Sequence, residues 1–126
     1  MSAKRILIVE DEQHIQYTLK LFLQYKGYEI EVADNGRLAL ELFRRDRDLG
    51  ASFDLVLTDI KMPEMDGPEM VEIMRAEGYD GPVIVMTGYG AEQHFKRLRQ
   101  AKCSGMVEKP FTPSSMETLI SQTLEC

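Results

Sequence analysis

The sequence predicts a doubly wound α/β domain in which a parallel sheet of five strands is covered on both faces by five helices. Short apolar runs rich in Val, Ile and Leu recur along the chain, and each of the first four precedes a stretch with helical spacing of apolar residues. A further helical stretch closes the chain. Because a parallel connection needs about a dozen residues, which a helix supplies, this alternation indicates parallel strands between two layers of helices.

The five strands are expected at the short apolar runs. For five such units in an open sheet, the flavodoxin-like order 2-1-3-4-5 is favoured, and it places the first and third strands side by side where the strand order reverses. The predicted strands are Arg5 to Val9 (RILIV), Glu29 to Ala33 (EIEVA), Leu55 to Thr58 (LVLT), Val83 to Thr87 (VIVMT) and Gly105 to Val107 (GMV).

Between and after the strands, apolar residues recur at i, i+3 and i+4, which predicts one buried face on each of the five helices. The polar stretch 44–52 (RRDRDLGAS) is the longest polar connection and is predicted to be a solvated loop. The predicted helix faces are Ile15, Leu19, Phe22 and Leu23; Ala39, Leu42 and Phe43; Met70, Ile73 and Met74; Phe95, Leu98 and Ala101; and Met116, Leu119 and Ile120.

The composition indicates one globular domain spanning residues 1–126. Hydrophobic residues make up 44% of the chain and charged residues 29%, the balance of a soluble protein. Apolar runs are too short to cross a membrane and no signal peptide precedes the first strand, so we expect a cytoplasmic protein with free thiols at Cys103 and Cys126. The net charge of −6 argues against direct nucleic acid binding.

Polar residues stand where the predicted strands end, at the edge of the sheet where folds of this kind bind ligands. Glu10 and Asp11 follow the first strand, Asp59 follows the third, Thr87 ends the fourth, and Lys109 follows the fifth. Neighbouring strands lie about 4.8 Å apart, so these side chains should converge on one small pocket.

Three carboxylates in one pocket require a cation. Two like charges near 4 Å repel by about 4 kcal/mol at an effective dielectric of 20. Mg²⁺ suits such a site because it prefers oxygen ligands and shares its remaining positions with water and phosphate. Lys109 and the Thr87 hydroxyl would suit a phosphoryl group, which makes one carboxylate a candidate nucleophile that forms an acyl phosphate.

Each residue also has a simpler interpretation when it is taken alone. Asp11 could cap the following helix, Glu10 could end a strand at the surface, Thr87 could belong to a turn, and Lys109 to an exposed loop. Asp59 has no such simple interpretation, because a carboxylate two residues after Leu57 and directly before Ile60 is not placed to cap a helix. The joint placement of all five at strand ends favours a site.

Four motifs in this order resemble the response-regulator receiver domain, the CheY-like family of two-component signalling, over essentially the whole chain. They are ILIVEDE (6–12), LVLTDIKMPEMDG (55–67), VIVMTG (83–88) and VEKPF (107–111). The resemblance implies that Asp59 is the phosphoacceptor and that Glu10 and Asp11 help to hold Mg²⁺ directly or through water. It also implies that the backbone carbonyl of Lys61 is a further metal ligand.

The same resemblance assigns the remaining roles. Thr87 is similar to the family's switch hydroxyl, Lys109 to the lysine that contacts the phosphoryl oxygens, and a cis peptide is implied before Pro110. The family implies a sensor histidine kinase or phosphotransfer protein as donor, and a downstream target or linked output domain that recognises a changed surface of helix four, strand five and helix five. A phosphorylation-dependent dimer is among the implied assemblies. Multiple turnover of an external substrate is not expected, so the chain is not predicted to be an enzyme.

The sequence departs from the family pattern beside the expected site. Met106 stands where the family usually carries Tyr or Phe, and Gly88 where Ala is common. The loop after Thr87 is the expected moving part, and Tyr89 within it is hypothesised to shield the acyl phosphate from water. The basic cluster of Lys96, Arg97 and Arg99 is interpreted as a solvated helix face, and docking of an acidic partner is the alternative. His14 and His94 are interpreted as surface residues.

Three rival functions are weighed against this one. A phosphatase of the haloacid-dehalogenase type needs a second aspartate two residues after the first, where Lys61 stands. A flavodoxin-like FMN carrier needs a phosphate-binding loop after the first strand, where Glu10 and Asp11 would repel the phosphate. A pseudo-receiver, a pure interaction module that takes up no phosphate, usually lacks acidic or lysine members of the set, and all are present here.

Overall fold

The computed structural model of the chain describes residues 3–88 and 95–125. Its sheet contains five parallel strands in the order β2-β1-β3-β4-β5, which confirms the predicted topology. The strands are β1 (Arg5–Val9), β2 (Glu29–Ala33), β3 (Leu55–Asp59), β4 (Val83–Thr87) and β5 (Gly105–Glu108).

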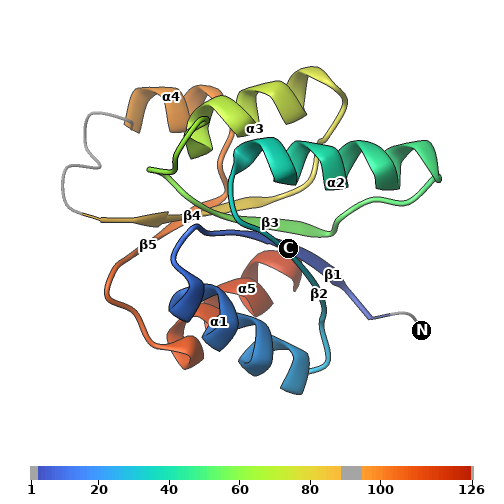
Figure 1. Cartoon of the computed structure of the whole chain (residues 1–126). Helices are drawn as coiled ribbons and strands as arrows, with labels where there is room; N and C mark the ends of the chain where they lie inside the picture. The colour runs from blue at the N-terminus through green and yellow to red at the C-terminus, as the bar shows by residue number, and fades with distance from the viewer. Residues whose placement is uncertain (1–2, 89–94, 126) are drawn as a thin grey trace.

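Five helices cover the sheet in two layers. Helices α1 and α5 lie on one face, and α2, α3 and α4 lie on the other (Figure 1). In the described part of the chain, no helix has the length and apolar character needed to cross a membrane. The helices are α1 (Gln13–Tyr25), α2 (Gly36–Asp48), α3 (Gly67–Ala76), α4 (Phe95–Gln100) and α5 (Pro113–Glu125).

The three central strands contribute to a separate hydrophobic core on each side of the sheet. Side chains alternate along a strand, so Ile6 and Ile8 face α1 and α5, whereas Leu7 and Val9 face the other layer. Strands β1, β3 and β4 are therefore apolar on both faces, as expected of a doubly covered parallel sheet. The predicted helix faces meet these cores through Leu19 and Leu23 of α1, Ala39 and Phe43 of α2, Met70 and Met74 of α3, Leu98 of α4, and Met116 and Ile120 of α5.

Two strands extend one residue beyond their predicted ends. Asp59 pairs with Met86 in the β3–β4 register, and Glu108 pairs with Thr87 in the β4–β5 register. Asp59 is thus the last residue of its strand rather than the first residue of the following loop. The sheet fixes its main chain on one side.

The prediction of a solvated loop at residues 44–52 holds for residues 49–52, which are exposed and follow α2, but it is wrong for residues 44–48. Residues 44–48 form the last turns of α2, and the helix stops before Gly50, which adopts a φ of +79°. The backbone amide of Ala51 donates to the carbonyl oxygen of Asp46 at 2.8 Å and closes this helix end. A run of charged residues looks solvated in the sequence, but Asp46 is only 4% exposed because an arginine from β1 reaches it.

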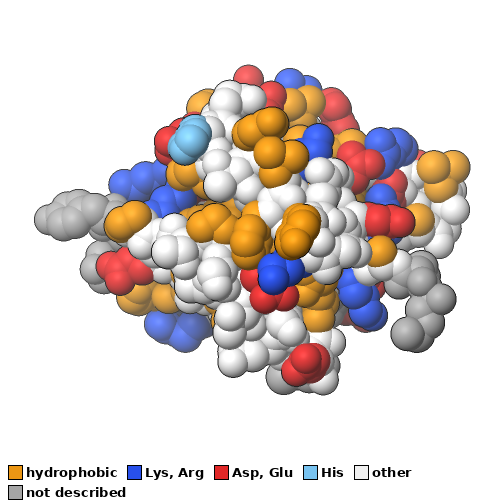
Figure 2. Space-filling view, turned by 90° about the horizontal axis from the view of Figure 1, so that it is seen from below, with side chains coloured by type: hydrophobic (Ala, Val, Ile, Leu, Met, Phe, Trp, Pro, Cys, Tyr) orange, Lys and Arg blue, Asp and Glu red, His pale blue; other side chains and the backbone are white. Residues whose placement is uncertain are grey.

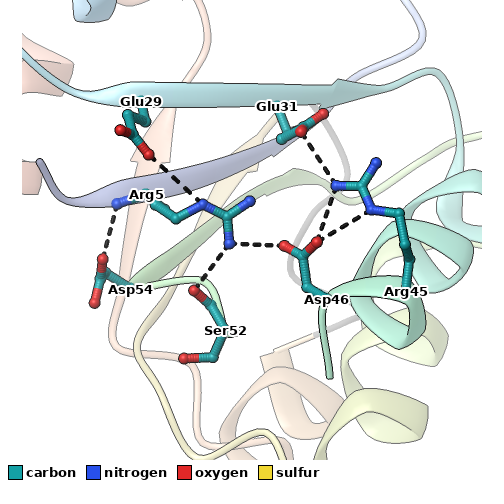
Figure 3. Close-up of polar contacts among 7 residues, drawn as sticks. All are labelled: Arg5, Glu29, Glu31, Arg45, Asp46, Ser52 and Asp54. Carbon is teal, nitrogen blue, oxygen red and sulfur yellow. Dashed lines mark hydrogen bonds and ion pairs between the residues drawn. The ribbon is translucent and has the colours of Figure 1, made fainter. Parts of the chain in front are cut away.

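Arg5 and Asp46 are the centre of a polar network at the amino-terminal edge of the sheet (Figure 3). Arg5 Nη1 lies 2.7 Å from Asp46 Oδ2, while Arg45 Nη2 donates to Asp46 Oδ1 at 2.9 Å. The backbone amide of Arg5 donates to Asp54 Oδ2 at 2.8 Å. The network joins the end of α2 to the start of β1 and to the segment that leads into β3.

Arg75 forms a second polar link, between α3 and the end of α4. Its guanidinium donates to four backbone carbonyl oxygens. Two of them, at Tyr79 and Gly81, precede β4, and two, at Ala101 and Lys102, directly follow α4. One side chain therefore fixes three chain segments on this side of the sheet.

The solvent side of α1 carries exposed apolar side chains. Tyr17, Leu21 and Tyr25 are 63%, 48% and 85% exposed, and their spacing of four residues places them along one line of the helix. Figure 2 views the molecule from the side of α1 and α5 and shows hydrophobic side chains at this surface. His14 lies on the same exposed side of α1, as predicted.

We expect Asp46→Asn to lower the free energy of unfolding by about 1.5 to 3 kcal/mol at neutral pH, because the ion pair with Arg5 and the charge-assisted hydrogen bonds from Arg45 are lost. Burial raises the pKa of Asp46, but these arginines more than offset it and the folded pKa lies below the ordinary value. The stabilisation is therefore complete above the ordinary carboxyl pKa and is lost as pH falls through the folded pKa. Urea denaturation between pH 7 and pH 3 measures it.

Asp48→Asn is the matched control, since Asp48 ends the same helix with an exposed side chain. We expect it to change stability by less than about 0.5 kcal/mol. Equal losses in the two variants would contradict the role assigned to Asp46.

Candidate functional site

Three carboxylates meet at the carboxyl ends of β1 and β3. One carboxylate oxygen from each of Glu10, Asp11 and Asp59 lies within 4.8 Å of the others. Glu10 is fully buried and Asp59 is 9% exposed, while Asp11 is open to solvent. The predicted convergence of these side chains is confirmed.

Glu10 is a buried acid with both oxygens engaged, not a surface residue at the end of a strand. Oε1 accepts from Lys109 Nζ at 2.9 Å, and Oε2 accepts from the backbone amide of Glu12 at 3.1 Å. Burial raises the pKa of Glu10 to about 7 although the hydrogen bond from Lys109 opposes it. The cost of burying the Glu10 charge therefore exceeds the stabilisation that Lys109 supplies.

Asp59 has a fixed orientation but remains accessible. Oδ1 accepts from the backbone amide of Ile60 at 2.8 Å, and Oδ2 accepts from Lys109 Nζ at 3.0 Å. Its side chain is 13% exposed. Both features suit a nucleophile, because the carboxylate is held in one orientation and an incoming group can still reach it.

Lys109 connects the two buried acids. Its Nζ contacts Glu10 and Asp59 together, and the Lys109–Pro110 peptide is cis, as the resemblance implies. Burial lowers the pKa of Lys109, but the hydrogen bonds to Glu10 and Asp59 outweigh this and raise it above the ordinary value. The lysine is therefore a permanent cation at the site, not an exposed loop residue.

Thr87 ends β4 beside the lysine. It is 6% exposed, and its hydroxyl donates to the carbonyl oxygen of Val107 at 3.3 Å. This distance is long for an O–H···O hydrogen bond. This hydrogen bond is therefore weak, and the hydroxyl can donate to a better acceptor instead. The backbone amide of Lys109 donates to the Thr87 carbonyl at 2.7 Å, so the two residues are joined through the main chain.

The remaining predictions concern Asp11, Lys61, Tyr89 and His94. Asp11 does not cap α1, because the residue at the cap position is Glu12. The side chain of Lys61 is exposed, and the role of its backbone carbonyl as a metal ligand stays a prediction. Tyr89, proposed to shield the acyl phosphate, and His94 lie outside the described residues.

The residues present fit a divalent cation. Three carboxylates and one ammonium group sum to a charge of −3 + 1 = −2 when all are ionised, which one divalent ion balances. The donors are all oxygen, and the exposed side of the cluster leaves room for water or phosphate. These are the preferences of Mg²⁺.

Two residues that position the site were missed or undervalued at the level of sequence. Gln16 is buried behind Glu10, and the signal was its place at i−3 from Leu19 on the inner face of α1. Gly67 ends the motif at residues 55–67, and the motif alone does not reveal its steric role. A Cβ atom at Gly67 would lie 2.2 Å from the Asp59 carbonyl oxygen, so only glycine allows α3 to begin so close to the acidic site.

The fold and site define an α/β domain with an acidic, lysine-bridged pocket at the switch point of its parallel sheet. The family model of the response regulator receiver domain matches residues 6–121. The chain belongs to this family and is a response regulator receiver domain of two-component systems.

Similar proteins agree with this assignment. Regulatory protein AtoC of Escherichia coli is 36% identical over 96% of this chain and 25% of its own length. Response regulator MprA of Mycolicibacterium vanbaalenii is 32% identical over 94% of the chain and 48% of its own length. The chain thus spans less than half the length of these curated relatives.

Solved structures show the same architecture. A CheY-like response regulator receiver domain protein from Methanospirillum hungatei superposes with a TM-score of 0.89 at 31% identity, covering 98% of this chain and 95% of that one. The chemotaxis protein CheY4 of Vibrio cholerae superposes with a TM-score of 0.83 at 27% identity, over 97% and 99% of the two chains.

We expect Gly67→Ala to destabilise the protein by about 1 to 3 kcal/mol or more, because the new methyl group collides with a backbone oxygen. The start of α3 must then move away from Asp59. Thermal unfolding measures the loss.

Gly88→Ala is the control beside the same site, since nothing lies within 4 Å of a Cβ atom built there. A melting temperature that falls equally in both variants would contradict the steric role of Gly67.

Proposed function

We propose that Asp59 accepts a phosphoryl group from a phosphohistidine donor in a reaction that requires Mg²⁺. The observation that carries this proposal is the position of Asp59 itself. Its carboxylate is oriented by Ile60, bridged to Glu10 by Lys109, and accessible from one side. Glu10, Asp11 and Asp59 would hold the metal, with the Lys61 carbonyl as a further ligand.

The chemistry follows from this arrangement. An Asp59 oxygen attacks phosphorus, the new O–P bond forms as the donor's P–N bond breaks, and the released imidazole nitrogen takes up a proton from solvent. When bound, Mg²⁺ neutralises the charge on the carboxylates and on the phosphoryl oxygens. Lys109 would stabilise the same negative charge, since its ammonium group already lies 3.0 Å from Asp59 Oδ2.

The phosphoryl group then offers new acceptors to two donors. Lys109 and the weakly held Thr87 hydroxyl gain charge-assisted hydrogen bonds of about 1.5 to 3 kcal/mol each, about 3 to 6 kcal/mol together. Shifting a two-state element from 1:99 to 99:1 requires about 5.5 kcal/mol. The upper end of this range is sufficient to switch a two-state element of the domain.

The surface that changes would be α4, β5 and α5. Met106 of β5 is 45% exposed and lines a small pocket of about 120 Å³ together with Phe95, Leu98, Arg99 and Cys103. A flexible thioether can fill this pocket or leave it. We propose that Met106 takes the place of the usual aromatic residue in linking Thr87 to this surface, where a downstream partner or linked output domain binds.

The donor would approach between α1 and the segment that follows β5. An open groove of about 490 Å³ lies there and reaches Lys109. Its walls are largely apolar and include Ile15, Pro110 and Phe111. The same helix also carries exposed apolar side chains at Tyr17, Leu21 and Tyr25. A sensor histidine kinase or phosphotransfer protein is thus the proposed partner, in the cytoplasm.

The basic residues of α4 contribute less to partner binding than their number suggests. Arg97 donates to Glu72 Oε1 at 3.0 Å and to Asp66 Oδ2 at 3.2 Å. It is therefore already paired within the domain, while Lys96 and Arg99 are exposed. The solvated-face interpretation is favoured over docking of an acidic partner.

The rival pseudo-receiver function has no support, because the acids and the lysine are all present and in contact. We propose that the protein phosphorylates and dephosphorylates only itself, without turning over an external substrate.

Incubation with Mg²⁺ and acetyl phosphate should add one phosphoryl group to the protein, detected as a mass increase. Asp59→Asn should abolish the addition because the amide is not a nucleophile toward phosphorus. Asp80→Asn, at an exposed position before β4, should leave it unchanged. Labelling that persists in Asp59→Asn would refute the proposal.

Thr87→Val should retain phosphoryl uptake but lose most of the conformational response. One of two hydrogen bonds is removed, so the equilibrium constant between the switched and unswitched states of the phosphorylated domain should fall by about 10- to 100-fold. Amide hydrogen exchange of α4 and β5, with and without acetyl phosphate, measures this response. A variant that switches as fully as the parent would exclude Thr87 from the mechanism.

A further inference from the structure

The side-chain amide of Gln16 joins three elements behind the acidic site. Gln16 lies in the first turns of α1 and is 8% exposed. Its Nε2 donates to the backbone carbonyl oxygen of Glu10 at 3.0 Å and to Asp34 Oδ1 at 2.9 Å. The amide therefore links α1 to the residues that directly follow β1 and β2.

The bond to Glu10 fixes the peptide that leads into Asp11. The backbone amide of Glu10 donates to the Ala33 carbonyl at 3.1 Å, so the main chain of Glu10 is held on both sides. A carbonyl and the N–H that follows it belong to one planar unit, so the start of Asp11 is fixed as well. Asp11 is exposed, and its placement depends on this main chain rather than on packing.

Asp34 keeps the Gln16 amide in the required orientation. Its carboxylate is a charged acceptor, which makes a stronger hydrogen bond than a neutral one. Hydrogen bonds from Gln16 and then Gln13 lower the pKa of Asp34. With one N–H directed at Asp34, the other N–H of the same nitrogen is directed at Glu10. A neutral amide does this without adding positive charge that would compete with a metal ion.

We propose that Gln16 is a positioning residue for the Mg²⁺ site, which holds the Glu10–Asp11 peptide in the orientation that brings both carboxylates to Asp59. This inference rests on the proposed function. Residues that orient metal ligands from outside the ligand set typically change metal affinity by about 10- to 100-fold when they are replaced.

Gln16→Met tests the assignment, because it keeps the length of the buried side chain and removes both donors. We expect the Mg²⁺ dissociation constant, measured by isothermal titration calorimetry, to rise by about tenfold. Gln13→Met is the matched control. Gln13 Nε2 donates only to Asp34 Oδ1, at an exposed position, so its loss should leave Mg²⁺ affinity unchanged.

Phosphoryl uptake from acetyl phosphate gives a second measurement. The rate in Gln16→Met should fall at limiting Mg²⁺ and recover at saturating Mg²⁺, since the residue affects metal affinity and not the chemical step. The melting temperature in EDTA separates this effect from a general loss of stability.

If Gln16→Met does not fold, Asp34→Ala is the alternative variant. Asp34 is exposed, and its replacement removes the acceptor that orients the Gln16 amide. Asp34→Asn removes the same charge but keeps an oxygen acceptor, so it should bind Mg²⁺ more tightly than Asp34→Ala. Parent-like affinity in Gln16→Met, or equal affinity in the two Asp34 variants when Gln16→Met is unfolded, overturns the role of Gln16. Failure of the unaltered protein to bind Mg²⁺ and to take up phosphate overturns the proposed function instead.

Discussion

The complete burial of Glu10 at the end of β1 is the constraint on which the rest of the site depends. A buried carboxylate is unfavourable unless a cation reaches it, and Lys109 is that cation within the described chain. Lys109 follows β5, three strand positions away from β1 in the sheet, so its ion pair with Glu10 forms only when β1, β3, β4 and β5 have assembled. The same ammonium group contacts Asp59. Folding and the assembly of the site are therefore one event.

The opposite edge of the sheet solves a similar electrostatic problem in another way. Asp46 is nearly as buried as Glu10, but arginines contact both of its oxygens. Its carboxyl pKa lies below the ordinary value, whereas that of Glu10 lies well above it. One edge is thus electrostatically satisfied and stabilises the fold. At the other edge Lys109 does not fully offset the cost of burying Glu10, and a divalent cation would stabilise the ionised carboxylate further.

The parts of the fold that could be predicted were those with strong periodic signals. Apolar runs such as RILIV define buried strands because parallel strands covered on both faces contain few polar residues. The site residues could be predicted because strand order brings the ends of β1 and β3 together. Residues 44–48 could not be placed, since the burial of Asp46 depends on Arg5, about forty residues earlier in the chain. Gln16 was missed for a similar reason, because its partners follow other elements and only the folded chain brings them to it.

Arg75 and Arg97 restrain α4 to different degrees along its length. Arg75 fixes the carbonyls of Ala101 and Lys102, while Arg97 of α4 is held through partly exposed ion pairs with Asp66 and Glu72. Exposed ion pairs are weak compared with a guanidinium that donates to four carbonyls. If phosphorylation of Asp59 displaces the end of β4, as proposed, we therefore expect α4 to move most at the end that is remote from Arg75.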